Sequence, residues 1–286
     1  MFTGEVNSDN AERYQYVFQL QRDASMFHVA AWLFDAETKQ VLLHEEKIAS
    51  LIESNAYNWK IGHAFLRFNA INASWVFGAK LDAQHGFNFK VDMLKPAQKT
   101  PITQLLRKGV AFIIMQTGPL DGHIVLPNQV GSQFVNSKKT WFRQIWAERA
   151  SDPTHPLKGV LCQFNDGSGF YSMNIYETDA LRGAVAGLFD ASGSAMNVSQ
   201  FINVSHATDG QWHIRIPSPM MHVVLTDSMQ DPNLAGGFVQ YMQQQGFCLV
   251  NEALLNPMPS IPPEPDNMQN KLAFFTQLWN DKEQHA

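Results

Sequence analysis

The sequence predicts an all-β protein of two antiparallel β-barrels side by side, followed by one amphipathic helix at the C-terminus. Three observations predict this fold class. Apolar and polar residues alternate with period two in many short segments, and turn-forming residues separate these segments at roughly ten-residue spacing. About fifteen such segments occur in the 286 residues, which is too many for one eight-stranded barrel and agrees with two.

The first part of the chain is a series of predicted hairpins. The turn DAET at 35–38 and the turn DAQHG at 82–86 contain the residues that tight connections favour. Between and around these turns the residues alternate or form short apolar runs, as strands of a half-buried sheet do. Strands are therefore predicted at 14–21, 26–34, 40–45, 59–68, 74–81 and 86–94.

The same pattern continues in the second part of the chain. A hairpin is predicted around the turn Asn165-Asp166-Gly167, and another around the turn at 190–193. Further strands are predicted at 110–116, 123–126, 131–135, 140–146, 183–189, 195–204, 211–217, 221–226 and 247–250. We expect the first barrel to span 12–178 and the second to span 179–256.

The C-terminal segment departs from the β pattern. Residues 257–266 hold five prolines and predict an extended linker. Residues 267–284 predict a helix, because apolar residues recur at a spacing of three and four. This helix is expected to pack on the flank of a barrel, and a lid or a homodimer contact are the alternatives.

Composition limits the partners and the location. A net charge of −5, with no basic block beyond Lys138-Lys139, argues against nucleic acid. Cys162 and Cys248 lie in apolar segments and predict buried free thiols in a reducing compartment, although two cysteines could also pair. The sequence shows no signal peptide and no transmembrane segment, so we expect a cytoplasmic protein.

The segment TWFRQIW at 140–146 is the leading candidate for the wall of a pocket. On a strand, Trp141 and Arg143 share one face, while Gln144 and Trp146 share the other. Arg143 in an apolar cavity calls for a carboxylate or an anionic ligand, and Arg143, Gln144 and Tyr171 are candidate donors to a substrate carbonyl. We expect catalytic roles for Arg143, Gln144, Tyr171 and Glu252, and substrate-binding roles for Trp141, Trp146, Trp32, Trp59, His63 and Trp212.

Motifs for cofactor chemistry are absent from the sequence. There is no phosphate-binding glycine loop, no G-x-S-x-G segment and no His or Cys cluster with the spacing of metal ligands. The ten histidines are scattered, and apart from His63 each is expected to be a hydrogen-bonded structural residue. We therefore expect no cofactor and no metal.

Several segments in the same order resemble one family. They are YVFQLQR, GFNFKVDMLKP, TWFRQIW, QFNDGSGFYSMNIY, WHIRIPSPMMHVVLT and VNEAL. The chain is similar to the AttH-like, carotenoid 1,2-hydratase-type lipocalin-like proteins, and this resemblance implies two calycin-like barrels. It also implies a departure, because Arg143 stands where the family has an aspartate that is proposed as the acid in hydration. Hydration by that aspartate is therefore not expected here.

The expected function is a cofactor-independent enzyme that acts on an apolar small molecule, such as a polyketide, a polyene or a terpenoid-like compound. The reaction would be that of a cyclase, an isomerase or a hydratase-like lyase, and cofactor-free pericyclic cyclases are among the relatives that the resemblance allows. A non-catalytic carrier of a hydrophobic ligand is the alternative, since it needs the same apolar cavity without converging polar groups. A structural protein with filled barrels is a third hypothesis.

Overall fold

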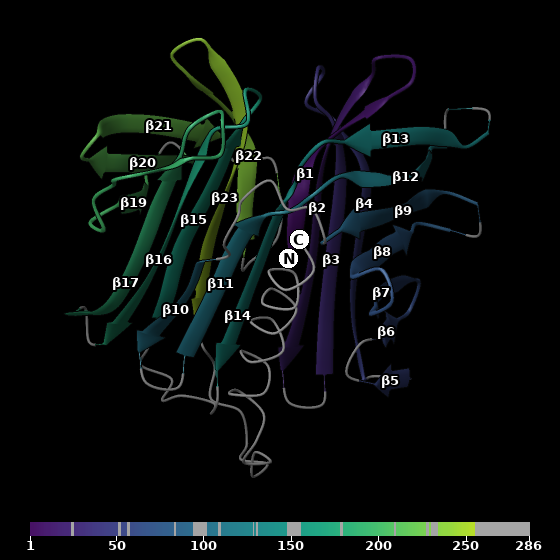
Figure 1. Ribbon diagram of the computed structural model, residues 1–286, viewed down its shortest axis with the longest axis horizontal. Helices are drawn as coiled ribbons and strands as arrows, with labels where there is room; N and C mark the ends of the chain where they lie inside the picture. The colour runs from purple at the N-terminus through teal and green to yellow at the C-terminus, as the bar shows by residue number, and fades with distance from the viewer. Residues whose placement is uncertain are drawn as a thin grey trace. The chain divides into compact units, whose positions relative to one another are not determined.

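A computed structural model describes residues 1–23, 26–50, 53–55, 58–82, 84–93, 102–107, 110–127, 129, 131–147, 156–177, 180–208, 210–226, 229 and 234–254. Every regular element in these residues is a β-strand, and the strands form two sheets (Figure 1). The all-β prediction is confirmed. The predicted linker and helix at 257–286, and with them the homodimer contact, lie outside the described residues.

The first sheet has 14 strands and curls into a nearly closed barrel (Figure 1). Its strands are β1 (Phe2–Ser8), β2 (Arg13–Asp23), β3 (Met26–Asp35), β4 (Val41–Ser50), β5 (Glu53–Asn55), β6 (Asn58–Ile61), β7 (Ala64–Asn69), β8 (Ser74–Lys80), β9 (Gly86–Asp92), β10 (Ile102–Arg107), β11 (Val110–Gln116), β12 (Leu120–Val125), β13 (Gln133–Ser137) and β14 (Trp141–Ala147).

Strand β1 pairs with three other strands of this sheet. One of its edges pairs with β2, and its other edge is divided between two antiparallel strands. Phe2 and Thr3 pair with β14, whereas Asn7 and Ser8 pair with β13. The sequence analysis missed β1, because the segment FTGEVNS has only two large apolar residues and does not show a clear alternation.

Aromatic rings fill the interior of the first barrel. Phe2 on β1 stacks on Phe77 on β8 with 4.5 Å between ring centroids, although these strands are not neighbours in the sheet. Phe18 lies 5.0 Å from Phe77, and Tyr16 lies 5.0 Å from Phe89. Small barrels are filled by inward-pointing side chains in this way. Much of the high aromatic content of the chain is thus a packed core.

The second sheet has nine strands and forms a half-barrel. Its strands, in order along the sheet, are β18 (Ala195–Met196), β17 (Ala180–Phe189), β16 (Gly169–Glu177), β15 (Pro156–Phe164), β23 (Gln244–Leu254), β22 (Leu234–Tyr241), β21 (Met220–Thr226), β20 (Gln211–Pro217) and β19 (Asn203–His206). The prediction of two barrels is confirmed, with the second of them open.

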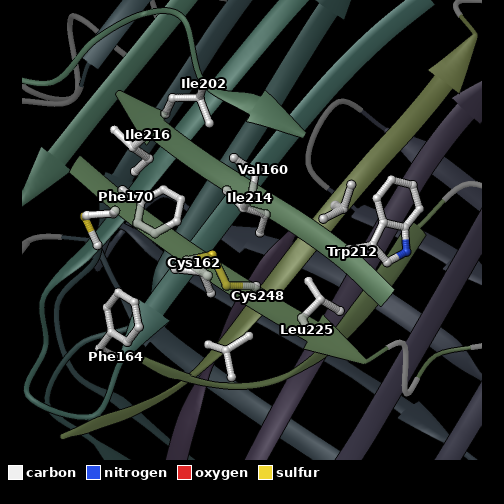
Figure 2. Packing of buried hydrophobic residues seen from close by; sticks show 14 of the residues in the cluster. Val160, Cys162, Phe164, Phe170, Ile202, Trp212, Ile214, Ile216, Leu225 and Cys248 are labelled. Carbon is white, nitrogen blue, oxygen red and sulfur yellow. A yellow bond between two sulfur atoms is a disulfide. The ribbon is translucent and has the colours of Figure 1, made fainter. Parts of the chain in front are cut away.

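The concave side of the second sheet holds its own apolar cluster. Figure 2 shows Ile214 and Ile216 of β20 packed toward Val160 of β15 and Phe170 of β16. Cys162 and Cys248 lie in the same cluster, where they are directly paired residues of β15 and β23 and form a disulfide. The prediction of free thiols is wrong, because only the register of these two strands brings the cysteines together. Disulfides persist in oxidising compartments, so the cytoplasmic location loses this support and stays a prediction.

Aspartates close the predicted turns. The Oδ1 atom of Asp35 accepts hydrogen bonds from the backbone amides of Glu37 and Thr38. Asp82, Asp166 and Asp190 accept comparable bonds from amides two to four residues later. Such side-chain bonds replace the backbone partners that a tight turn leaves open. The four turns predicted at these aspartates are therefore confirmed.

Contacts within the chain divide it into two compact units. The first contains the described residues of Met1–Ile102 and Ile113–Gln144, and the second those of Thr103–Phe112 and Ile145–Ser260. The domain limits expected from the sequence, 12–178 and 179–256, stay predictions.

Candidate functional site

The strands of the first sheet carry a second buried face, which we call the outer face. It consists of the residues of β14, β1, β2, β3 and β4 that alternate away from the aromatic interior. Directly paired residues point to the same side of a sheet, so the register assigns each residue to a face. One row of paired residues across the outer face is Trp141, Thr3, Val17, Trp32 and His44.

A second row lies next to the first. Arg143 and Met1 exchange two backbone hydrogen bonds of 2.9 and 3.0 Å, which places them directly opposite each other on β14 and at the start of β1. The β1–β2 register continues this row to Gln19, and Gln19 pairs with Ala30 on β3. Ala30 in turn pairs with Glu46 on β4. Trp141 and Arg143 therefore share a face, as their spacing predicts.

Large parts of the outer face are buried even though they lie outside the barrel interior. Trp32 is 1% exposed, Trp141 is 4% exposed and Arg143 is 5% exposed. Gln15 and Gln19 are buried beside them. Burying amides and a guanidinium is costly, so these groups are unusual on a face that only supports the fold. Two tryptophans together with a buried cation and two amides are typical of a ligand site.

The two buried glutamines of the outer face differ in their hydrogen bonds. The Nε2 atom of Gln15 donates to Thr3 Oγ1 and to the carbonyl of Tyr16, at 3.2 Å each. The Oε1 atom of Gln19 is buried and has no hydrogen-bond partner within the described part of the chain. A buried acceptor without a partner destabilises the fold, and it can be satisfied by a donor from a ligand or a water molecule.

Burial also shifts the ionisation of this face. It lowers the pKa of Arg143 to about 10, so the guanidinium remains a cation at neutral pH. Burial, and secondly the charge of Arg143, lowers the pKa of the Met1 amino group to about 4. A cation held in a medium of low polarity acts strongly on any oxygen that approaches it, because little water screens its charge.

A histidine and a carboxylate meet at the β3–β4 side of the outer face. His28 Nε2 lies 2.8 Å from Glu46 Oε1, and their side chains are 14% and 34% exposed. The carboxylate of Glu46 is bonded to Nε2 and orients the ring, so Nδ1 is the nitrogen that faces other partners. Nearby, His44 stacks on Trp32 with 4.6 Å between ring centroids. The outer face thus passes from a buried region at β14 to a more accessible region at β4.

Sequence reasoning missed His28, Glu46 and Gln19. His28 was expected to be structural, and the other two residues carried no motif. Period two alone places His28 on the same face as Trp32. The predicted hairpin turn at 35–38 does not give the position of Glu46, because the β3–β4 register shifts by one residue between Leu33 and Phe34. No local signal identifies Gln19.

Other predicted residues of the first unit lie elsewhere. Gln144 alternates away from Arg143 on β14 and is half-buried. Trp59 is in register with Leu66 and through it with Phe77, so it lies on the interior face, where it stacks on Trp75 at 6.0 Å. His63 is exposed in the turn between β6 and β7. Their assigned roles stay predictions.

Two predicted residues of the second unit lie on opposite faces of its sheet. Trp212 belongs to the concave cluster together with Phe170, and the alternation of β16 turns Tyr171 to the other side. Tyr171 is 1% exposed and packs against Phe112 and Phe189, at 5.8 and 6.0 Å between ring centroids. Burial raises its pKa. A site that used both residues would need groups from both faces of one sheet.

The remaining two predicted residues are placed only by their backbone. Trp146 lies near the end of β14, and Glu252 lies near the end of β23, opposite Lys158 on β15. In the described part of the chain, no group of three or more His, Cys, Asp and Glu side chains could hold a metal ion. That part also contains no helix long and apolar enough to span a membrane.

A nearly closed barrel and a half-barrel, each built from antiparallel strands, define a lipocalin-like all-β protein. The fold is that of the AttH-like, carotenoid hydratase-type proteins that the sequence motifs resemble. An AttH-type protein from Nitrosomonas europaea superposes with a TM-score of 0.58 and 15% sequence identity, over 87% of this chain and 90% of that one. Kievitone hydratase from Nectria haematococca also gives a TM-score of 0.58, with 9% identity, over 89% of this chain and 88% of that one. No protein-family model and no curated protein sequence matches this chain.

Proposed function

We propose that this chain is a hydratase-like enzyme that adds water to a conjugated, largely apolar carbonyl compound at the outer face, without a cofactor. The observation that carries the proposal is the buried guanidinium of Arg143, in the row next to Trp141 and Trp32. Kievitone hydratase has the same fold, which supports the choice of hydration over cyclisation or isomerisation. Polyketide-like and polyene-like enones are the substrate class that matches an aromatic wall with one cation.

The tryptophans and the cation have separate tasks in this proposal. The rings of Trp32 and Trp141 pack against the apolar body of the substrate and exclude water from it. Arg143 donates hydrogen bonds to the carbonyl oxygen, where negative charge develops during the reaction. Because Arg143 is buried, this stabilisation is stronger than a surface arginine could give.

The His28–Glu46 pair supplies the proton transfers. Glu46 holds His28 through Nε2, and His28 Nδ1 removes a proton from water as its oxygen bonds to the β-carbon of the enone. The π electrons move to the carbonyl oxygen and form an enolate that Arg143 stabilises. The proton on His28 then moves to the α-carbon as the carbonyl forms again. The product is the β-hydroxy ketone, and His28 returns to its neutral form.

The spacing of the two groups agrees with this reaction. Arg143 on β14 and His28 on β3 are three strands apart, so usual strand spacing separates their strands by about 14 Å, and His28 lies two residues along β3 from the row of Arg143. Their side chains cover part of this distance. The remainder accommodates a carbonyl group, its conjugated double bond and one water molecule.

The experiment is a turnover assay with a panel of aryl vinyl ketones and conjugated polyenones in water enriched in oxygen-18. We expect at least one compound to gain one water molecule with the heavy isotope, as measured by mass spectrometry. His28→Gln should lower this rate by about 10²- to 10⁴-fold, the usual contribution of a general base. His123→Gln, at an exposed histidine of β12, is the matched control and should retain the rate.

The carrier hypothesis predicts a different result. A carrier would bind members of the panel, measured by quenching of tryptophan fluorescence, and would release them unchanged. Binding without any incorporation of oxygen-18 would contradict the proposed hydration and favour the carrier. The buried guanidinium and the His28–Glu46 pair weigh against a carrier, because transport of an apolar ligand requires neither.

A further inference from the structure

We propose that the second unit holds a separate binding site for a small polyhydroxylated molecule. The site is a cavity of about 220 Å³ on the concave side of the second sheet. It is lined by Lys158, Ser172, Asn174, Tyr176, Ile202, Asn203 and Val204. None of these residues takes part in the proposed hydration, so this inference stands independently of it.

The lining shows a change of chemistry along one face of one strand. On β16, Phe170 belongs to the apolar cluster, and Ser172, Asn174 and Tyr176 follow it on the same face. Ser172 is 2% exposed and Asn174 is 4% exposed, so they are as deeply buried as the apolar residues before them. A face that is buried and yet polar departs from the pattern that a core requires, and such departures are expected at functional positions.

The hydrogen bonding of Asn174 indicates which kind of ligand would bind. Its Oδ1 atom is buried and has no hydrogen-bond partner in the described part of the chain, while its Nδ2 atom donates to the hydroxyl of Tyr176 over 3.4 Å. If the two atoms of the amide exchanged places, a buried N–H group would lack a partner instead. A ligand hydroxyl satisfies either arrangement, because it can both donate and accept.

Lys158 is the charged residue among the described residues that line the cavity, and it lies directly opposite Asn174 on β16. A positive charge in the wall disfavours a cationic ligand, whereas a ligand without positive charge meets no such repulsion.

The volume of the cavity and its aliphatic wall also fit a small polyol or a monosaccharide. At ~30 Å³ for each water molecule, the cavity has the volume of about seven waters, which is that of a small polyol or a monosaccharide. Ile202 and Val204 provide an aliphatic side against which C–H groups of such a molecule can pack. Hydroxyls on one side and C–H groups on the other match the two halves of the wall.

The test is titration calorimetry of the full chain with glycerol, myo-inositol and glucose, supported by saturation-transfer NMR. We expect at least one of the three to bind. Asn174→Leu, which is close in volume, should weaken that binding by about tenfold or more, as expected for the loss of one or two hydrogen bonds. Ser172→Ala should weaken it less. Asn197→Leu, at an exposed position outside the cavity, is the matched control and should bind as the wild type does.

Two results overturn the inference. The first is that none of the three compounds binds to the wild-type chain, which would mean that the cavity holds water alone. The second is equal binding by the wild type and by both cavity variants. Arg143→Met separates this site from the proposed enzyme, since it should lose hydration and keep polyol binding. Loss of both properties in Arg143→Met would contradict an independent site.

Discussion

The two units differ in which side of the sheet carries the polar groups of the proposed sites. In the first unit aromatic rings fill much of the barrel interior, and Arg143, Gln15 and Gln19 are buried on the outer face. In the second unit the concave side itself turns polar, at Ser172 and Asn174. The two proposed sites therefore lie on opposite sides of sheets that have the same antiparallel construction. A closed barrel that is full has only its outside left for function, whereas an open one keeps part of its inside.

The largest effect is expected in the filled interior of the first barrel. Phe77 contacts Phe2, Tyr16, Phe18 and Phe89, so Phe77→Ala leaves a cavity among them. We expect a loss of about 3–5 kcal/mol in the free energy of unfolding, measured by denaturant titration.

The matched control for this substitution lies on the surface of the same unit. Phe134→Ala removes a ring that is 39% exposed and should cost less than about 1 kcal/mol. Equal losses for Phe77→Ala and Phe134→Ala would show that the interior is not the main source of stability.

On the outer face, a substitution should lower enzymatic activity much more than stability. Arg143→Met removes the cation but keeps most of the side-chain volume, and we expect hydration to fall by about 10²- to 10³-fold. Because methionine fills most of the same volume and leaves no large cavity, the loss in unfolding free energy should be smaller than that of Phe77→Ala. Turnover and denaturant titration measure the two effects. Arg67→Met, at an exposed arginine on β7, is the control and should change neither.

The disulfide is expected to have the next largest effect, and it acts on the second unit. Cys162 and Cys248 are 86 residues apart in sequence, so the bond removes many conformations of the unfolded chain. Replacing both cysteines by alanine should cost about 2–4 kcal/mol. A reducing agent should lower the unfolding temperature of the wild type and leave that of the double variant unchanged. An equal response of both proteins would argue against the bond.

The smallest effect compares one tyrosine from each unit. The hydroxyl of Tyr16 is hydrogen-bonded to Thr140, whereas the buried hydroxyl of Tyr171 has no partner among the described residues. Tyr16→Phe should therefore cost about 1 kcal/mol, and Tyr171→Phe should be neutral or stabilising by up to about 1 kcal/mol. If Tyr171 is catalytic, as the sequence suggested, Tyr171→Phe will lower turnover as well. Stability and turnover measured together distinguish these cases.

Tyr16 and Tyr171 should also make the stability of the protein depend on pH in the alkaline range. Burial raises the pKa of both above the ordinary value of about 10, so the unfolded chain loses these protons before the folded chain does. The folded state then binds more protons, and stability falls as the pH rises above about 10. In Tyr171→Phe this fall should be smaller. An unchanged slope of unfolding free energy against pH would contradict the assignment.

Local patterns predicted much of the fold and one part of the site. Period-two alternation predicted most of the strands. Aspartates and glycines predicted the turns at 35–38, 82–86, 165–167 and 190–193. The same alternation placed Trp141 and Arg143 together. The site could not be completed from sequence, because Gln19 and Glu46 reach Arg143 and His28 only through the pairing of separate strands. Whether Trp59 faces the core or a ligand likewise depends on the strands around it.

The sequence by itself therefore determined the class of fold, the turns and the shared face of Trp141 and Arg143. These properties depend on residues a few positions apart, and the backbone geometry of a strand relates such residues directly. Only the tertiary structure decided that the first barrel is full, that Cys162 meets Cys248, and that Asn174 lines a cavity. Each of these depends on register between strands far apart in the chain, and a slip of one residue would turn every side chain of a strand to the other face.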